Sequence, residues 1–211
     1  MKDKPSEWVS IADLMAGVMA IVMLLLVVSV IQRNYNELKL KNELEQGVAS
    51  QRKIVSSIFN NMKQTLKDLN LTNLADFDTI GYKITFKDGI FERGSALVTP
   101  QAKNAFSQSQ IKVMEFLEKL PKGKIYVEGH TDNVPVARPV IDFQKFGAVY
   151  DDNFTLSAAR AREARKYIIG KLSDQAANRV IVAGYGSSFP IDPVHPENAC
   201  NRRVEIKFVI D

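Results

Sequence analysis

The chain has 211 residues, which is room for one ordinary domain with additional segments. Its net charge of +4 at pH 7 is mildly basic, and the sequence shows no arginine-rich arm, zinc-finger spacing or aromatic RNA-binding motif, so we expect no nucleic-acid partner. The single cysteine, Cys200, excludes an intramolecular disulfide; we expect a small buried residue beside the last strand, and the alternative is a thiol able to pair with another chain.

Residues 9–31 form an apolar segment in which Asp13 is the only charged residue. A helix of this length rises about 34 Å, enough to cross a hydrocarbon core of about 30 Å. The length of the run, the acidic residues Asp3 and Glu7 and the lack of a small-x-small site after Ile31 disfavour a cleaved signal peptide. We therefore predict an uncleaved transmembrane helix over 9–31 behind a short tail, residues 1–8. Basic residues flank both ends, so charge leaves the orientation open.

Asp13 lies about 6 Å of helix rise inside the apolar segment. It could reach water at the headgroup boundary, or it could face a partner helix and bind a proton or a sodium ion, because acids within membrane spans commonly mark ion pathways. A stripe of small residues that favours close helix packing accompanies it: Ala12, Ala16, Gly17 and Ala20. Position alone leaves both interpretations open.

Residues 32–72 predict an amphipathic helical linker. Apolar residues recur mostly three or four positions apart, at Leu40, Leu44, Val48, Val55, Ile58, Met62, Leu66 and Leu69. The resulting seam is narrow enough to pair with a copy of itself, and we favour a dimerising helix. The alternative is that the seam packs onto the domain that follows.

Residues 73–211 alternate between strand and helix patterns. Strands are predicted at 82–86, 124–128, 180–183 and 204–210. One helix is predicted over 101–120, with Thr99 as N-cap and Pro100 in the first helical position. A second is predicted from Ser157 to Leu172, with Ser157 as N-cap. This order predicts an α/β domain with helices packed on one face of a mixed β-sheet.

Five motifs in this region are similar to the signature of the OmpA-like peptidoglycan-binding family. They are FERGSALVTPQAK at 91–103, GHTDN at 129–133, NFTLSAARA at 153–161, GYGSSFP at 184–190 and NRRVEI at 201–206. The resemblance covers roughly residues 78 to 211. It implies a domain that binds peptidoglycan through the diaminopimelate of the stem peptide.

Diaminopimelate carries an ammonium and carboxylates, so its site needs an acid and a guanidinium a few ångströms apart. The family's ligand-binding aspartate and arginine correspond to Asp132 and Arg160, the latter expected in the first turn of its helix. Further candidate lining residues are Thr131, Asn153 and Leu156, with Arg202 or Arg203 as a second cation. For the arginines the alternative is a structural ion pair with Asp174, Glu163 or Glu205.

The sequence departs from compact family members in a longer stretch, residues 134–152, between two of the motifs. This insert could cover the pocket, contact glycan or pair with a partner domain. Its acids Asp142, Asp151 and Asp152 favour a solvated loop over a calcium site. Two histidines, His130 and His195, are too few for a convincing metal site, and no hydrolytic arrangement stands out. We therefore expect no metal, no cofactor and no enzymatic activity.

The motif Ala-Asp-Leu-Met at 12–15 resembles ion-driven stator subunits of the MotB type, and the run WVSIADLMAGVM at 8–19 resembles the ZorB subunits of Zorya anti-phage systems. The resemblance implies a homodimer surrounded by MotA-like (ZorA) membrane subunits, with H⁺ or Na⁺ carried on Asp13. It also implies the inner membrane, with the N-terminus cytoplasmic and the C-terminal domain periplasmic. The alternatives are a flagellar stator subunit and a passive envelope tether that conducts no ions.

Overall fold

The computed structural model describes residues 7–92 and 94–210. Residues 1–6 of the predicted tail therefore lie outside the described residues. The first helix, α1, spans Glu7–Asp68. The chain divides into two compact units, Met1–Ser50 and Gln51–Asp211. Each unit is described by itself below.

The first unit is helical wherever it is described, and the side chains from Trp8 to Ser50 are exposed. Among the described residues, one helix is long and apolar enough to cross a membrane by length and composition, and it lies near the N-terminus. The helix predicted over 9–31 is therefore confirmed as a helix. Large apolar side chains such as Leu24 and Ile31 have no protein cover within this unit, so a lipid or a partner must cover them.

The second unit contains a five-stranded sheet in the order β1-β2-β5-β3-β4. Its strands are β1 (Ala75–Asp78), β2 (Lys83–Phe86), β3 (Lys124–His130), β4 (Val180–Gly184) and β5 (Arg203–Val209). The pair β3–β4 is parallel, and the other pairs are antiparallel. The predicted mixed sheet is confirmed, with an additional edge strand, β1, that the sequence pattern did not indicate.

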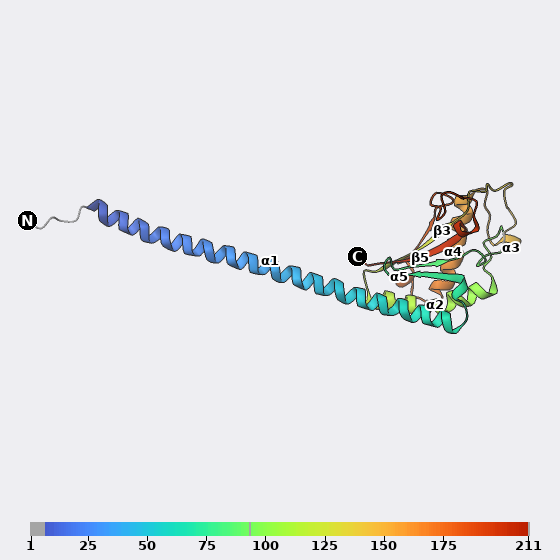
Figure 1. The fold of residues 1–211 in the computed structure, drawn as a ribbon, viewed down its shortest axis with the longest axis horizontal. Helices are drawn as coiled ribbons and strands as arrows, with labels where there is room; N and C mark the ends of the chain where they lie inside the picture. The colour runs from blue at the N-terminus through green and yellow to red at the C-terminus, as the bar shows by residue number, and fades with distance from the viewer. Residues whose placement is uncertain (1–6, 93, 211) are drawn as a thin grey trace, which may run out of the picture. The chain divides into compact units, whose positions relative to one another are not determined.

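Two long helices, α2 (Pro100–Lys119) and α4 (Asn153–Ile169), cover one face of this sheet (Figure 1). Shorter elements complete the unit: α3 (Phe143–Phe146), α5 (Asp174–Ala177) and the 3-10 turns η1 (Thr72–Leu74) and η2 (Ala199–Asn201). The start of α2 is as predicted, because Thr99 Oγ1 accepts the Ala102 N–H at 3.4 Å and Pro100 is the first helical residue.

The predicted start of α4 was wrong. The helix begins at Asn153, and its N-cap is Asp152, whose Oδ1 accepts the Thr155 N–H at 2.6 Å. Ser157 therefore lies inside the helix, where its hydroxyl donates to the carbonyl of Phe154 at 2.8 Å. Asp and Ser are comparably good caps, so the type of cap residue alone did not distinguish Asp152 from Ser157.

The end of α1 belongs to the core of the second unit. Five of its apolar residues are almost fully buried: Val55, Ile58, Phe59, Met62 and Leu66. The Phe59 ring lies edge-on to that of Phe208 on β5, with centroids 4.9 Å apart. For residues after 50, the predicted seam therefore packs onto the domain, which was the alternative to self-pairing. Leu40, Leu44 and Val48 are exposed, and pairing with a second copy stays a prediction for them.

Cys200 is exposed, so its expected burial was wrong. The buried position in this turn is taken by the next residue, Asn201. The Asn201 side chain accepts the N–H groups of Ile191 and Asp192 at 2.8 and 3.1 Å and donates to the carbonyl of His195 at 3.2 Å. An amide that satisfies three backbone groups at once fixes the loop, and the neighbouring thiol then faces outward.

Candidate ligand-binding site

Two paired glycines bring α4 close to the ends of β3 and β4. Gly129 and Gly184 lie opposite each other in the parallel pair. A Cβ on Gly129 would lie 2.0 Å from the carbonyl oxygen of Ser157, and one on Gly184 would lie 2.6 Å from the Cβ of Ala158. Any side chain at either position would therefore push the helix away from the sheet.

This close approach connects the segments that follow β3 and β4. The Ser157 hydroxyl accepts the N–H of Gly186 at 2.9 Å, and the N–H of Thr131 donates to the carbonyl of Gly186 at 2.9 Å. The residue after Thr131, Asp132, is thus held beside the first turns of α4. The Thr131 hydroxyl is buried and has no hydrogen-bond partner among the described residues.

A cavity of about 820 Å³ opens at this place. Six of the seven predicted peptidoglycan-binding residues line it: Thr131, Asp132, Asn153, Leu156, Arg160 and Arg202. Charged residues of both signs line it. The acids are Asp88, Glu92, Asp132 and Glu197, and the bases are Arg138, Arg160 and Arg202. A zwitterionic ligand fits such a lining better than a purely anionic or cationic one.

Asp132 is held on both carboxylate oxygens. Its Oδ1 accepts the N–H of Val134 at 3.2 Å, and its Oδ2 accepts Nη1 of Arg202 at 2.7 Å. The Asn153 side chain fixes the same loop by donating to the carbonyls of Asp132 and Val134 at 3.2 and 2.9 Å. Asn153 therefore positions the aspartate.

Arg202 bridges two acids. Besides Asp132 it contacts Asp88, with Nε to Oδ1 at 3.1 Å and Nη2 to Oδ2 at 2.6 Å. These hydrogen bonds, first to Asp88 and then to Asp132, raise the pKa of the guanidinium. The sequence analysis did not identify Asp88, because it is 114 positions away from Arg202 in the chain.

Arg160 is buried against the cavity with its guanidinium fixed in orientation. Its Nε donates to the carbonyl of Ser95 at 2.9 Å, and its Cζ lies 5.4 Å from the centre of the Phe91 ring. Burial lowers its pKa. Within the described residues its Nη atoms have no hydrogen-bond partner, which leaves the outer edge of the fork available to a ligand.

The expected place of Arg160 in the first turn of its helix was wrong, because α4 starts at Asn153. It lies two turns into the helix, so the free backbone N–H groups of the helix end are not beside it. Its ligand contacts must come from the guanidinium alone.

Arg203 is not among the residues that line the cavity. Its Nε pairs with Glu205 at 2.6 Å, and its Nη2 donates to the carbonyl of Phe189 at 3.1 Å. Arg203 therefore forms a buried ion pair with Glu205, which was the alternative interpretation for this arginine. Of the two candidates for a second cation, Arg202 is the one beside Asp132.

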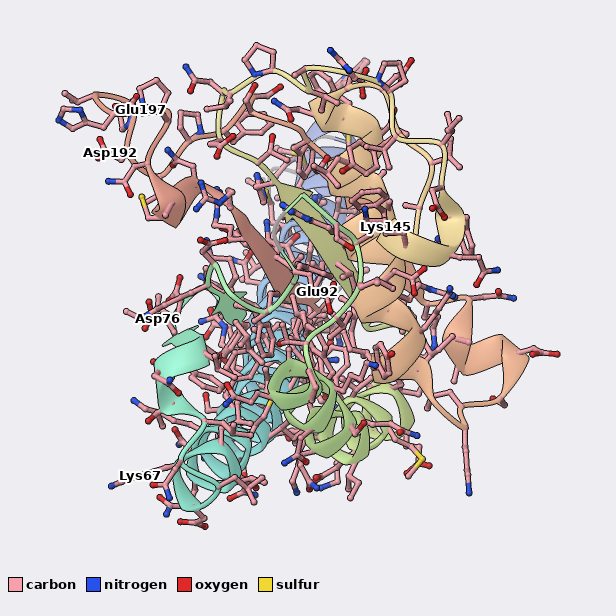
Figure 2. The ribbon with its side chains drawn as sticks, turned by 90° about the vertical axis from the view of Figure 1, so that its right-hand side faces the viewer. Lys67, Asp76, Glu92, Lys145, Asp192 and Glu197 are labelled. Carbon is pink, nitrogen blue, oxygen red and sulfur yellow. The ribbon has the colours of Figure 1, made fainter. Side chains whose placement is uncertain are left out.

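The insert, residues 134–152, forms one wall of the cavity. Seven of its residues line it: Val134, Pro135, Val136, Ala137, Arg138, Val140 and Tyr150. The hydroxyl of Tyr150 donates to the carbonyl of Gly94, and the hydroxyl of Ser95 donates to the carbonyl of Phe146 at 2.9 Å. Figure 2 shows this insert passing over α4, with Lys145 labelled on α3.

A small second core supports this wall. It contains Ala96, Ala148, Tyr150, Leu156 and Ala159, with Val136 and Val140 packed against it. The insert is therefore packed against the domain. Of the three possibilities for the insert, covering the pocket agrees best with its position in the cavity wall. Two of its acids, Asp142 and Asp152, accept backbone N–H groups as the N-caps of α3 and α4.

Comparison with known proteins agrees with this fold. The Zorya protein ZorB of Escherichia coli is 28% identical over 227 residues, which cover 99% of this chain and 90% of that protein. A putative MotB-like protein from Desulfovibrio vulgaris has a solved structure that is 22% identical, with a TM-score of 0.53, covering 76% of this chain and 99% of that one. The periplasmic domain of Helicobacter pylori MotB is 23% identical, with a TM-score of 0.46, over 61% of this chain and 74% of that one.

At 22% identity and a TM-score of 0.53, the Desulfovibrio vulgaris structure shows a shared fold. The sequence description of the OmpA family matches residues 90–203, more than half of the chain, and this stretch holds the ends of β3 and β4, the start of α4 and the insert that together form the cavity. This chain belongs to the OmpA family.

Proposed function

We propose that the cavity binds the stem peptide of peptidoglycan through diaminopimelate. The observation that carries this proposal is the convergence of an acid, a fixed guanidinium and neutral lining residues from separate segments on one cavity: Asp132, Arg160, Thr131, Asn153 and Leu156. A ligand with an ammonium and a carboxylate on one carbon requires that combination.

The two charged groups have distinct roles in this proposal. A carboxylate offers about four lone-pair directions. Asp132 uses two for Val134 and Arg202, so it can also accept an ammonium. Arg160 presents its Nη atoms to the ligand carboxylate, and the Ser95 carbonyl and the Phe91 ring prevent the fork from turning away. Because these supports are already in place, little side-chain entropy is lost on binding.

We further propose that the whole chain is the wall-anchored stator subunit of an ion-driven inner-membrane motor, of the kind to which ZorB of the Zorya system belongs. The similarity to ZorB over 99% of the chain supports this, as does an N-terminal helix long and apolar enough for a membrane. In this proposal residues 1–8 are cytoplasmic and residues 9–31 cross the membrane. Residues 32–72 link the membrane helix to the domain of residues 73–211, which lies in the periplasm.

In such a motor Asp13 carries the ion. A homodimer of this chain stands inside MotA-like (ZorA) subunits, and H⁺ or Na⁺ binds and leaves Asp13 where the two kinds of subunit meet. Ion flow performs work when the charge state of Asp13 favours one of two packings of the surrounding subunits over the other. The wall-binding domain holds the dimer still while the partner subunits move.

Co-sedimentation with purified peptidoglycan tests the wall-binding part. Arg160→Ala in the full chain in detergent should abolish co-sedimentation, and Arg162→Ala is the matched control, since Arg162 lies on the same helix, is exposed and pairs with Glu163. Undiminished binding by Arg160→Ala would refute the site. Circular dichroism of both variants excludes loss of the fold as the cause.

Phage challenge of cells carrying the complete operon tests the motor part. Asp13→Asn should remove protection at unchanged protein level, whereas Asp13→Glu, which keeps a carboxylate, should retain part of it. Full protection by Asp13→Asn would leave the passive tether as the function. A flagellar stator would instead show a motility defect and no effect on phage.

A further inference from the structure

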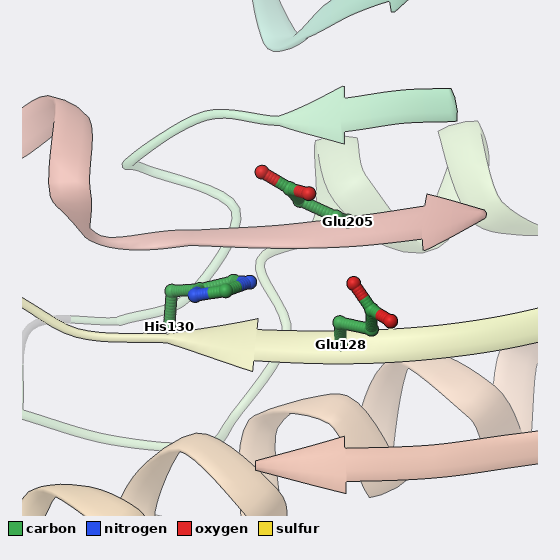
Figure 3. Close-up of side chains that lie close together, drawn as sticks. All are labelled: Glu128, His130 and Glu205. Carbon is green, nitrogen blue, oxygen red and sulfur yellow. The ribbon is translucent and has the colours of Figure 1, made fainter. Parts of the chain in front are cut away.

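The sheet has a second face, opposite the helices, that carries charged side chains. On β3 and β5, Glu128 lies directly opposite Glu205 and His130 lies opposite Arg203. Like charges directly opposite each other destabilise an antiparallel pair. The structure nevertheless brings the ligand atoms of Glu128, His130 and Glu205 within 4.8 Å of one another (Figure 3).

His130 is the unusual member of this group. It is 3% exposed, and neither ring nitrogen has a hydrogen-bond partner among the described residues. The Tyr185 ring stacks on it with centroids 5.4 Å apart, and Phe189 lies edge-on to Tyr185, so aromatic rings cover the imidazole. Buried polar atoms are nearly always paired, and an imidazole with two free nitrogens beside two carboxylates requires a partner.

We propose that Glu128, His130 and Glu205 form a binding site for a divalent transition-metal ion of the Zn²⁺ type. An imidazole nitrogen with carboxylate oxygens is a usual donor set for zinc, and three protein ligands leave a fourth position for water. Figure 3 shows the Glu128 and His130 side chains reaching from β3 toward β5, the strand that carries Glu205. Zinc ligands at about 2.1 Å lie within about 4 Å of one another, so side-chain rotation is enough to close the site.

Two cations currently hold Glu205 and must be accommodated. Lys83 contacts Oε2 at 3.0 Å, and Arg203 contacts Oε1 at 2.6 Å. Lys83 is one-third exposed, so its ammonium can move to water and release Oε2 to a metal. Arg203 can stay, because it also donates to the carbonyls of Asn201 and Phe189. The nearby positive charges weaken the site, and removing Lys83 should strengthen it.

The site is separate from the wall-binding cavity. None of its three residues lines that cavity, although His130 precedes Thr131, which does. The loss of one site therefore need not abolish the other, and the two can be tested independently.

Isothermal titration of the purified full chain in detergent with ZnCl₂ tests the proposal, after removal of metal with a chelator. We expect one Zn²⁺ per chain, with Mg²⁺ and Ca²⁺ failing to compete because an imidazole ligand favours transition metals. Co²⁺ should bind in the same place and give visible absorption bands of a nitrogen–oxygen site. An absence of stoichiometric Zn²⁺ binding would overturn the proposal.

Three variants distinguish this site from adventitious binding. Glu128→Gln keeps the shape of the side chain and should weaken Zn²⁺ binding at least tenfold, while His195→Ala, which removes an exposed histidine elsewhere, should not change it. Lys83→Ala should tighten binding several-fold, a gain that a purely structural cluster would not give. Equal affinities of Glu128→Gln and the wild type would refute the site, and peptidoglycan co-sedimentation, expected to be unchanged, reports on the fold of the variants.

Discussion

Arg202 and Asp132 are joined by a 2.7 Å ion pair between Nη1 and Oδ2, so the segment before β5 holds the loop after β3. Because Arg202 also pairs with Asp88, the charge on the proposed ligand-binding acid is balanced before any ligand arrives. A ligand ammonium therefore has to join an existing network. This makes the two acids on Arg202 a matched pair for mutation.

Asp132→Asn and Asp88→Asn should have unequal effects on binding of a soluble muropeptide. Each removes one carboxylate from Arg202, but only Asp132 contacts the ligand in our proposal. A hydrogen bond to a charged group contributes about 1.5–3 kcal/mol, so Asp132→Asn should weaken affinity by roughly 10- to 150-fold. Asp88→Asn should change it by less than about threefold, since the ligand contacts stay. Isothermal titration measures both, and equal losses would contradict the assigned role of Asp132.

Arg160→Lys should lose wall binding although it keeps the positive charge. A lysine cannot donate to the Ser95 carbonyl and present a two-pronged fork to a carboxylate at the same time. The buried carbonyl of Ser95 would also lose its donor, so we expect the free energy of unfolding to fall by about 1–3 kcal/mol. Urea denaturation with co-sedimentation measures both effects, and Arg162→Lys on the exposed side of α4 should change neither.

Much of this domain could be predicted because its signals are local. Alternating apolar residues indicate β2, β3, β4 and β5, and Thr99-Pro100 marks the start of α2 within one residue. The start of α4 could not be decided in the same way, since Asp152 and Ser157 are both good caps and lie five residues apart. In the structure Asp152 is the cap, and the Ser157 hydroxyl instead accepts the N–H of Gly186.

The candidate site was predicted as a set of residues, and its connections were not. The motifs name Asp132, Arg160 and Asn153, but they do not show that Arg202 also pairs with Asp88, which is 114 residues away in the chain. Likewise, the opposition of Glu128 and Glu205 depends on the register of β3 and β5, which a single sequence does not specify. Long-range pairing and register are tertiary properties, so they appear only with the fold.

Phe59→Ala tests whether the end of α1 is part of the domain core. The side chain is fully buried and contacts the rings of Phe77, Tyr82 and Phe208. Its removal should lower the free energy of unfolding of the domain by about 3–5 kcal/mol. Leu44→Ala, on an exposed seam position, should change it by less than about 0.5 kcal/mol. Denaturation followed by near-ultraviolet circular dichroism measures the domain, and comparable effects would contradict the division at residue 50.

Tyr150→Phe should loosen the insert without unfolding the domain. The variant keeps the ring in the small second core but loses the hydrogen bond to the Gly94 carbonyl, at a cost of about 1 kcal/mol. Because the insert is one wall of the cavity, amide hydrogen exchange of residues 134–152 should accelerate and peptidoglycan binding should weaken. Tyr126→Phe, on β3 and away from the insert, is the control. Unchanged exchange in Tyr150→Phe would show that the second core alone holds the wall.

Acid should destabilise the metal-free domain through His130. Burial, with a smaller contribution from Arg203, lowers the pKa of this histidine from 6.5 to about 4. Below pH 6.5 the unfolded chain therefore binds a proton that the folded domain does not, so stability is lost as the pH falls from 6.5 to about 4.

His130→Gln removes this titration. Between pH 7 and pH 4.5 the wild type should lose about 2 kcal/mol more of its free energy of unfolding than the variant. The other charged groups facing the imidazole, Glu128, Glu205, Lys83 and Arg203, are present in both proteins, so their own effects largely cancel in the difference. Urea denaturation in the presence of a chelator gives the comparison, with His195→Gln as the exposed control. If the wild type and His130→Gln lost stability in parallel, His130 would have to be hydrogen-bonded or solvated in the folded state, and its two free nitrogens would no longer argue for a metal.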